Sequence, residues 1–494
     1  MSSKLTRCAC AGVSRRMFLS DLGMGFTGLA LASLLHQDGV ARAGNTQAPW
    51  LPPDGQPHFA PKARSVIWLM MRGGVSHLES FDRKPDLDKQ GGKTIGQSAF
   101  AGILQSPHLK NVREQVLNNI IDKQKAVLYP TQIGFRQAGQ LGLEISDWWP
   151  HLRAQADNLA FIRSMWTTDN NHGAQLQLLT GRHLLDGCFP TIGAWIHYGL
   201  GALSEDLPQF VVMGPPLESQ CSEGLDADYL GPEHAGVLLN VDPKEPLPYA
   251  HPELAMSSGQ QTLEARLLGK LNQLTALEYP SDDKLRARIK SYELAFRMQS
   301  AVPEVLRFEE EKEETRRLYG LDRDVTRPFG QQLLAARRLV ERGVRFVQIC
   351  HGGGAAGAWD AHSKLKENHS NLCAQVDLPT AGLLQDLKQR GLLDETVVVW
   401  TTEFGRTPCA QGADGRDHHN YGFTIWMAGA GLKRGIVHGA TDELGFHAVE
   451  NRHYVTDIHA TLFHLLGLDP RRLEVPGRKR LEIDYGEVIQ GILA

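Results

Sequence analysis

The chain has few cysteines and no excess of positive charge. Its seven cysteines in 494 residues include no Cys-x-x-Cys pair, and the five beyond residue 43 are scattered. Their spacing predicts neither a cysteine-based zinc site nor a regular disulfide framework. Lysine and arginine total 52 against 56 aspartate and glutamate residues, so the chain lacks the basic excess typical of nucleic-acid-binding domains. We therefore expect no nucleic-acid partner.

Only the N-terminal region has the features of a targeting segment. Residues 14–19 read Ser-Arg-Arg-Met-Phe-Leu, no acidic residue precedes Asp21, and an apolar, glycine-containing stretch covers 22–35. Ala-Arg-Ala at 41–43 supplies the small residues of a cleavage site. The pattern predicts a twin-arginine signal peptide over 1–43, the twin-arginine export machinery as a partner, and a periplasmic or secreted mature protein. The alternative is a short buried or membrane-anchoring helix.

No later apolar run is long enough to cross a bilayer, so we expect no transmembrane segment in the mature chain. Residues 44–64 are rich in proline and polar residues and indicate a flexible lead-in. Short apolar runs then recur and are typical of strands buried on both faces of a parallel sheet. They lie at 65–71, 210–213, 344–349, 396–401 and 423–427.

Helical patterns separate these strands, for instance at 378–390 and 455–466. Strands that alternate with helices predict one α/β domain over 65–494, with helices on both faces of its sheet. A charged, Leu- and Ala-rich stretch at about 256–342 is interrupted by prolines and predicts a helical insertion. Its acidic run at 309–314 is typical of a solvated helix face.

Histidines and carboxylates gather where the predicted strands end. Asp360 and His362 follow the run at 344–349, Glu403 and Arg406 follow the run at 396–401, and His418 precedes the last run. In open α/β sheets, ligands bind beyond the carboxyl ends of the strands. Imidazole and carboxylate groups bind Zn²⁺ and similar divalent ions, so their convergence indicates a metal site. A single histidine or aspartate at a strand end is more typical of a residue that forms a hydrogen bond within a loop.

A further group follows the first strand. His77 and Asp82 lie just beyond residues 65–71 and are candidate metal ligands. Asp82 precedes Arg-Lys-Pro, however, and an aspartate at such a place is equally suited to cap a helix or a turn. Both interpretations of Asp82 stay open at this stage.

The chain resembles domain-of-unknown-function family 1501, a twin-arginine-exported family similar in fold to the alkaline phosphatase and sulfatase superfamily. Matching segments span nearly the whole mature chain: 77–85, 171–183, 292–299, 335–348, 359–362, 403–408, 415–418 and 457–467. The resemblance implies an alkaline phosphatase-like, mostly parallel central sheet with helices on both faces.

The resemblance also suggests roles for individual residues. Glu403 takes the place of a superfamily metal-binding carboxylate, Asp360 and His362 resemble its Asp and His pair, and His418 resembles its late His ligand. Leu-Thr-Gly-Arg at 179–182 matches the stretch that follows the superfamily nucleophile. Counting back to the nucleophile itself reaches Asn171, which cannot serve as a covalent nucleophile of the usual kind.

These inferences favour an exported, metal-dependent hydrolase of sulfate or phosphate esters that uses a metal-activated water. Zinc or calcium is the expected ion, and a small-molecule or glycan anionic ester the expected substrate. Arg406 or Arg182, with Arg72 as a further candidate, would hold anionic oxygens. Asn171 and His172 would line the site, with His172 as an acid or base. A non-catalytic binding or assembly module of the cell envelope is the main alternative, and a phosphomutase- or transferase-like activity is a smaller one.

Overall fold

The computed structural model describes residues 53–110, 126–218, 224–242, 246–247, 258–279 and 283–494. The predicted signal peptide and the first part of the lead-in lie outside the described residues. Within them, none of the helices combines the length and the apolar character needed to span a membrane.

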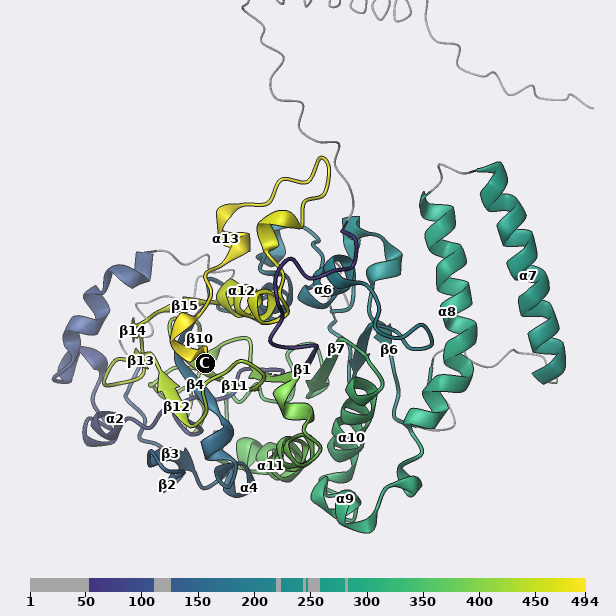
Figure 1. The fold of residues 1–494 in the computed structure, drawn as a ribbon. Helices are drawn as coiled ribbons and strands as arrows, with labels where there is room; N and C mark the ends of the chain where they lie inside the picture. Colours follow the sequence, from purple (N-terminus) through teal and green to yellow (C-terminus); the bar gives the residue numbers. More distant parts are fainter. Residues whose placement is uncertain (1–52, 111–125, 219–223, 243–245, 248–257, 280–282) are drawn as a thin grey trace, which may run out of the picture. The chain divides into compact units, whose positions relative to one another are not determined.

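A nine-stranded sheet forms the centre of the fold (Figure 1). Its strand order is β12-β4-β11-β8-β1-β7-β5-β6, and β15 also pairs with β4. Only β11 runs antiparallel to its neighbours, β4 and β8, so the sheet is mostly parallel. Its strands are β1 (Ser65–Met71), β4 (Ala160–Trp166), β5 (Phe210–Met213), β6 (Val237–Leu238), β7 (Phe346–His351), β8 (Thr396–Thr401), β11 (Phe423–Gly429), β12 (Ile436–His438) and β15 (His453–Tyr454).

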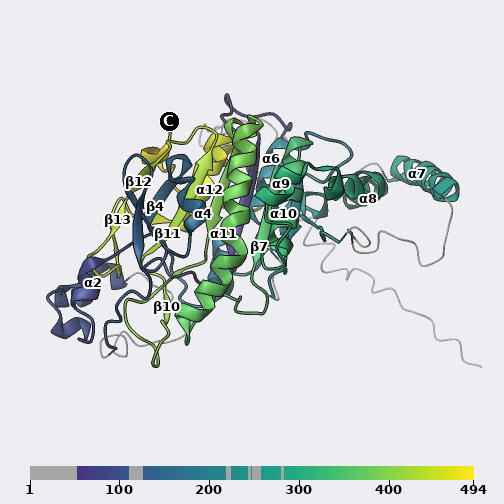
Figure 2. The ribbon, with the colours of Figure 1, turned by 90° about the horizontal axis from the view of Figure 1, so that it is seen from below.

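Both faces of this sheet are covered by helices. Alternate residues of β1 belong to two separate cores: Ile67 lies in one, and Trp68 in the other, because successive side chains of a strand point to opposite faces. The first core is completed by α4 (Pro150–Arg153), α10 (Arg327–Glu341) and α11 (Leu365–Gln389), and the second by α5 (Ala174–Thr180), α6 (Ile192–Leu200) and α12 (Val455–Leu465). The two layers are visible in Figures 1 and 2. The predicted α/β class is confirmed.

Further ribbons and α-helices lie outside the central sheet and the helices named above. Three two-stranded ribbons are formed by β2 (Phe135–Ala138) with β3 (Leu143–Ser146), β9 (Gly405–Arg406) with β10 (His418–His419), and β13 (Ala440–Thr441) with β14 (Ala448–Glu450). The remaining helices are α2 (Pro85–Lys89), α7 (Ser258–Glu278), α8 (Asp283–Val305), α9 (Glu313–Leu318) and α13 (Glu482–Tyr485).

The apolar runs locate five of the nine strands of the sheet, β1, β5, β7, β8 and β11, and they miss β4, β6, β12 and β15. Strand β7 extends to His351, which sequence analysis places just after the strand. Strand β4 was not predicted, because Arg163 and Ser164 interrupt its apolar pattern. Arg163 lies 3.7 Å from Asp82 and is thereby partly neutralised inside the fold. The region 256–342 contains α7 to α10, and α10 packs into the first core as an integral layer of the fold.

A buried ion network joins the helices of that layer. Arg337 of α10 is 2% exposed and lies 2.6 Å from Glu311 and 3.0 Å from Asp386 of α11. The Tyr319 hydroxyl donates a further hydrogen bond to Asp386 over 3.0 Å. Removing one member of such a network leaves the others charged and desolvated, which is costly.

We therefore expect Arg337→Met to lower the free energy of unfolding by about 3–5 kcal/mol, because Glu311 and Asp386 lose their buried cation. Urea denaturation followed by circular dichroism would measure the change. Arg64→Met is the matched control: its ion pair with Glu395 is more than half exposed on both sides, and its loss should cost less than about 1 kcal/mol. Equal losses in the two variants would contradict a stabilising role for the network.

Candidate functional site

The carboxyl edge of the sheet collects the candidate residues. Strands β7, β1 and β8 are adjacent and parallel, so the loops that follow them leave from the same edge. Asp360 lies in the loop after β7, and Glu403 lies two residues beyond β8. His172 lies just before α5, in the segment that follows β4. His418 belongs to β10, which pairs with β9 directly after Glu403.

Three imidazoles converge on the Asp360 carboxylate. The Nε2 atoms of His362 and His418 lie 2.9 and 3.0 Å from Asp360 Oδ1, and His172 Nε2 lies 3.3 Å from Oδ2. The Nε2 atoms of His362 and His418 are 3.0 Å apart. Potential metal ligands therefore form two groups that share His418: His172, Asp360 and His418, and His362, Asp417 and His418.

Each of these imidazoles is held from behind by an oxygen atom. Nδ1 of His172 lies 3.1 Å from Glu403 Oε1, Nδ1 of His418 lies 2.9 Å from the Asn170 carbonyl, and Nδ1 of His362 contacts Gln411 Oε1. A histidine whose Nδ1–H donates to such an oxygen directs its Nε2 lone pair the other way, as metal-binding histidines do. The three Nε2 atoms face one another, so the donor set fits a divalent cation.

The electrostatics of the cluster favour positive charge on His172 and His362 but not on His418. Burial by itself lowers the pKa of His172, but hydrogen bonds to Asp360 and Glu403, together with their negative charges, raise it to about 9. The pKa of Asp360 lies well below its usual range: burial opposes this, and hydrogen bonds from His172, His362 and His418 outweigh it. Burial lowers the pKa of His418, whereas the hydrogen bond to Asp360 raises that of His362.

Arg406 supports the cluster from inside the protein. Its side chain is fully buried, and Nη2 lies 2.7 Å from Asp360 Oδ1. Nε donates to the Gly74 carbonyl over 2.8 Å, and Nη2 also contacts the Gly73 and Trp359 carbonyls. These partners occupy the guanidinium, so it holds Asp360 in place and does not face a substrate.

Glu403 is fully buried and is held by the glycine turn after β1. Its carboxylate accepts hydrogen bonds from the Gly73 amide at 2.8 and 3.1 Å, and from Gln175 Nε2 at 3.0 Å. Gly73 has φ of +120°, and a Cβ there would lie 2.5 Å from the Asp360 amide nitrogen. Only glycine permits this close approach. Glu403 therefore orients His172 and lies behind the ligand groups.

Four other candidates have different partners. His77 Nε2 contacts the Gly445 carbonyl at 3.0 Å, and Asp82 lies 3.1 Å from Lys84, so neither belongs to the cluster. Arg72 is fully buried and donates to Gln175 and to main-chain carbonyls. Arg182 lies 2.6 Å from Asp484 and lines a separate cavity. Their contacts indicate structural or separate roles.

A cavity of about 520 Å³ opens beside His172. None of the described residues that line it carries a hydroxyl or a thiol; they are Asn171, His172, Gly173, Gln175, Leu176, Leu184, Leu185, Leu217, Glu218 and Ala355. The nearby hydroxyl of Thr167 is buried and donates to Gln177 over 2.6 Å. Thr168 Oγ1 accepts from Gln177 Nε2 at 2.7 Å. Both hydroxyls therefore have structural partners.

Several residues of the site were not singled out from the sequence. Asp417 joins His362 and His418 in the second group of potential ligands, and its position directly before His418 was the available signal. Asn170, Gln175 and Gln411 supply hydrogen bonds. Because amide and main-chain groups carry no chemical signature in a sequence, no signal could have identified these three.

The fold and the cluster define an α/β protein with a histidine- and aspartate-rich site of the kind that can hold a metal ion. Residues 63–493 match the family described as "Protein of unknown function (DUF1501)", and the chain belongs to this family. No curated protein matches the chain.

Solved structures with a similar arrangement include three from bacteria. The lipoteichoic acid synthase LtaP from Listeria monocytogenes is 10% identical, with a TM-score of 0.32 over 88% of this chain and 78% of that one. The phosphonate monoester hydrolase SpPMH from Silicibacter pomeroyi is 13% identical, with a TM-score of 0.31 over 67% and 73%. The PsFucS1 sulfatase from Pseudoalteromonas sp. is 11% identical, with a TM-score of 0.32 over 83% and 68%.

We expect Glu403→Gln to weaken zinc binding by about 10–100-fold, because the amide no longer fixes His172 with a negative charge. Competition with a chromogenic zinc chelator would measure the affinity. Glu395→Gln is the matched control, since Glu395 is an exposed carboxylate paired only with Arg64 at the surface. An unchanged affinity in Glu403→Gln would contradict the orienting role of this carboxylate.

The metal-free protein should lose stability as the pH rises through about 9. The folded-state pKa of His172 is raised from 6.5 to about 9, so its contribution is complete below pH 6.5 and disappears above the folded-state value. Added Zn²⁺ that binds at this imidazole would displace the same proton, so we expect its affinity to rise over this window. Calorimetry in buffers of different ionisation enthalpy should detect proton release at neutral pH. Binding without proton release would contradict the assignment.

Proposed function

We propose that this protein is an exported, metal-dependent hydrolase of sulfate or phosphate esters. One observation carries the proposal: the Nε2 atoms of His172, His362 and His418 surround Asp360, and an oxygen holds each Nδ1 atom from behind. The resemblance of the sequence to the alkaline phosphatase and sulfatase superfamily supplies the reaction class.

The donor set favours zinc over calcium. Calcium takes six to eight oxygen ligands, whereas the cluster offers imidazole nitrogens together with Asp360 and Asp417, a mixture that suits zinc. His172, Asp360 and His418 would hold one ion. His362 and Asp417, together with the shared His418, form the second group of potential ligands. When bound, a divalent ion supplies Lewis-acid chemistry, which polarises an ester and lowers the pKa of water.

The chain's own residues would position the reactants. Asn171 and His172 line the cavity beside the cluster, where the amide can hydrogen-bond an ester oxygen. Arg406 holds Asp360 and is not free to bind the ester. The absence of hydroxyl and thiol groups among the described lining residues favours water as the nucleophile over a covalent enzyme intermediate.

The wild-type protein, prepared with zinc available, should contain bound zinc and hydrolyse aryl sulfates or phosphate esters. Asp360→Ala and His418→Ala should each lose the metal and the activity, because they remove ligands from the centre of the cluster. His438→Ala is the matched control, since His438 pairs with His453 away from the cluster. Elemental analysis and an ester screen would measure both properties. A metal-free wild type would overturn the hydrolase proposal, whereas bound metal without turnover would favour the binding-module alternative.

Export in the folded state is the second part of the proposal and rests on residues 1–43, which lie outside the described residues. Replacing Arg15 and Arg16 with lysine should leave the protein in the cytoplasm, because the pathway recognises the arginine pair. Fractionation of cells that express each form would measure this. The control replaces Lys4 with glutamine and Arg7 with lysine and leaves the arginine pair intact. Equal retention of both variants in the cytoplasm would contradict recognition of the pair.

A further inference from the structure

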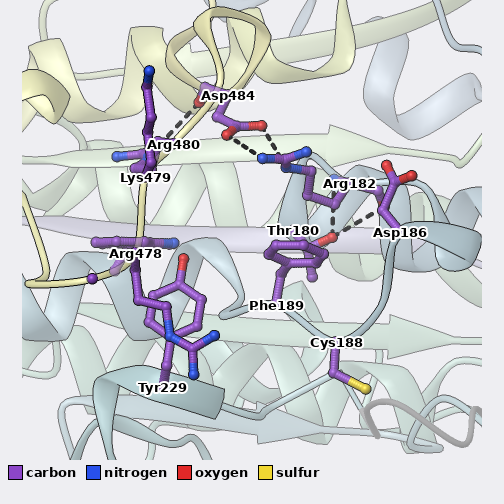
Figure 3. Close-up of a pocket in the computed structure, with 12 residues that line it drawn as sticks. Thr180, Arg182, Asp186, Cys188, Phe189, Tyr229, Arg478, Lys479, Arg480 and Asp484 are labelled. Carbon is purple, nitrogen blue, oxygen red and sulfur yellow. Dashed lines mark hydrogen bonds and ion pairs between the residues drawn. The ribbon is translucent and has the colours of Figure 1, made fainter. Parts of the chain in front are cut away.

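Residues 180–189 contribute to a second cavity as well as to the cavity beside His172. The second cavity has a volume of about 360 Å³ and is shown in Figure 3. Arg182 and Asp186 line this second cavity. Leu184 and Leu185, which lie between those two residues in the sequence, line the cavity beside His172. No described residue lines both cavities, and no member of the histidine cluster lines the second one.

Positive charge dominates its lining. Four basic side chains face two acidic ones: the basic residues are Arg182, Arg478, Lys479 and Arg480, and the acidic residues are Asp186 and Asp484. Asp484 is committed to Arg182 through a bidentate pair of 2.6 and 2.7 Å and accepts the Leu481 amide at 2.6 Å. Its charge is therefore balanced by Arg182.

Three consecutive cations remain on the opposite wall. Arg478 and Lys479 are exposed, and among the described residues neither forms an ion pair. The Arg480 guanidinium donates to the carbonyls of Pro470 at 3.2 Å and Asp484 at 3.0 Å. Burial lowers the pKa of Arg480, which means that its charge is incompletely solvated. The carboxylate of Asp484 acts on Arg480 but is shared with Arg182, so an anion would add counter-charge to this wall.

Aromatic rings hold the guanidinium groups in place. The Arg478 guanidinium lies 5.0 Å from the centre of the Tyr229 ring, that of Arg480 lies 4.5 Å from the centre of the Trp195 ring, and that of Arg182 lies 4.8 Å from the Phe189 ring. Stacking of this kind is attractive and restricts the side chains before a ligand arrives. A planar, restrained guanidinium binds a tetrahedral oxyanion through paired hydrogen bonds.

We propose that this cavity binds the sulfate or phosphate group of an anionic ester whose body is about the size of a monosaccharide. Inorganic sulfate and phosphate share the charged group but leave most of a 360 Å³ cavity unfilled, a volume within the range of small-molecule sites. The aromatic side chains of the lining can contact the uncharged body of the ligand. This site requires no metal and no turnover, so it stands apart from the proposed hydrolase activity.

Calorimetric titration of the purified protein at fixed ionic strength would test the proposal. The probes are inorganic sulfate, inorganic phosphate, a sulfated monosaccharide, a phosphorylated monosaccharide and the unmodified sugar. We expect saturable binding of an ester-bearing sugar and none of the unmodified one. Arg478→Ala/Lys479→Ala should weaken binding at least about tenfold, because it removes charge-assisted hydrogen bonds; both residues are exposed, so the fold should be retained.

Lys89→Ala/Lys93→Ala is the matched control, since it removes two exposed charges near α2. Asp360→Ala removes the proposed metal site and should still show one saturable binding event with the sugar ester, because Asp360 does not line this cavity. Equal weakening by the control would indicate non-specific attraction and overturn the proposal, as would loss of binding in Asp360→Ala alone. Binding of the inorganic ions without the sugar esters would overturn the assignment of an ester ligand, and failure of every probe would overturn the site.

Discussion

The contact between Asp360 and three histidines is the constraint on which the site depends. A partly buried carboxylate such as Asp360, which is 18% exposed, gains from counter-charge and hydrogen-bond donors, because water solvates its charge incompletely. Asp360 obtains them from His172, His362, His418 and Arg406. His172 follows β4, His362 follows β7, Arg406 follows β8 and His418 precedes β11. The cluster therefore forms only when all four segments are in place.

Much of the polar interior serves to hold these segments. Arg406 binds Asp360 and the glycine turn after β1, and Glu403 links that turn to His172. Arg416 and Glu79 form a fully buried pair with a distance of 2.5 Å nearby. Arg406, a candidate anion ligand in the sequence, is therefore bonded to groups within the protein. Its hydrogen bonds fix the conformation of the loops that it connects.

The two cavities divide the chemistry between them. The cavity beside His172 has leucines and neither arginine nor lysine among its described lining, whereas the second cavity is lined by three arginines, a lysine and aromatic side chains. Residues 180–189 contribute to both, with Leu184 and Leu185 on one side and Arg182 and Asp186 on the other. We propose metal chemistry for the cavity beside His172 and oxyanion binding for the second cavity, and the segment 180–189 lines both.

The sequence by itself determined the α/β class, the family and most strands, because buried parallel strands are continuous apolar runs that local composition reveals. It also indicated that Asp360, His362 and His418 lie near one edge. Only the tertiary structure decided which charged residues share a site. Arg182 pairs with Asp484, Asp82 lies near Arg163 as well as Lys84, and the oxygens of Asn170 and Gln411 hold two of the histidines. Long-range packing sets the direction of each side chain, and a linear pattern does not contain that information.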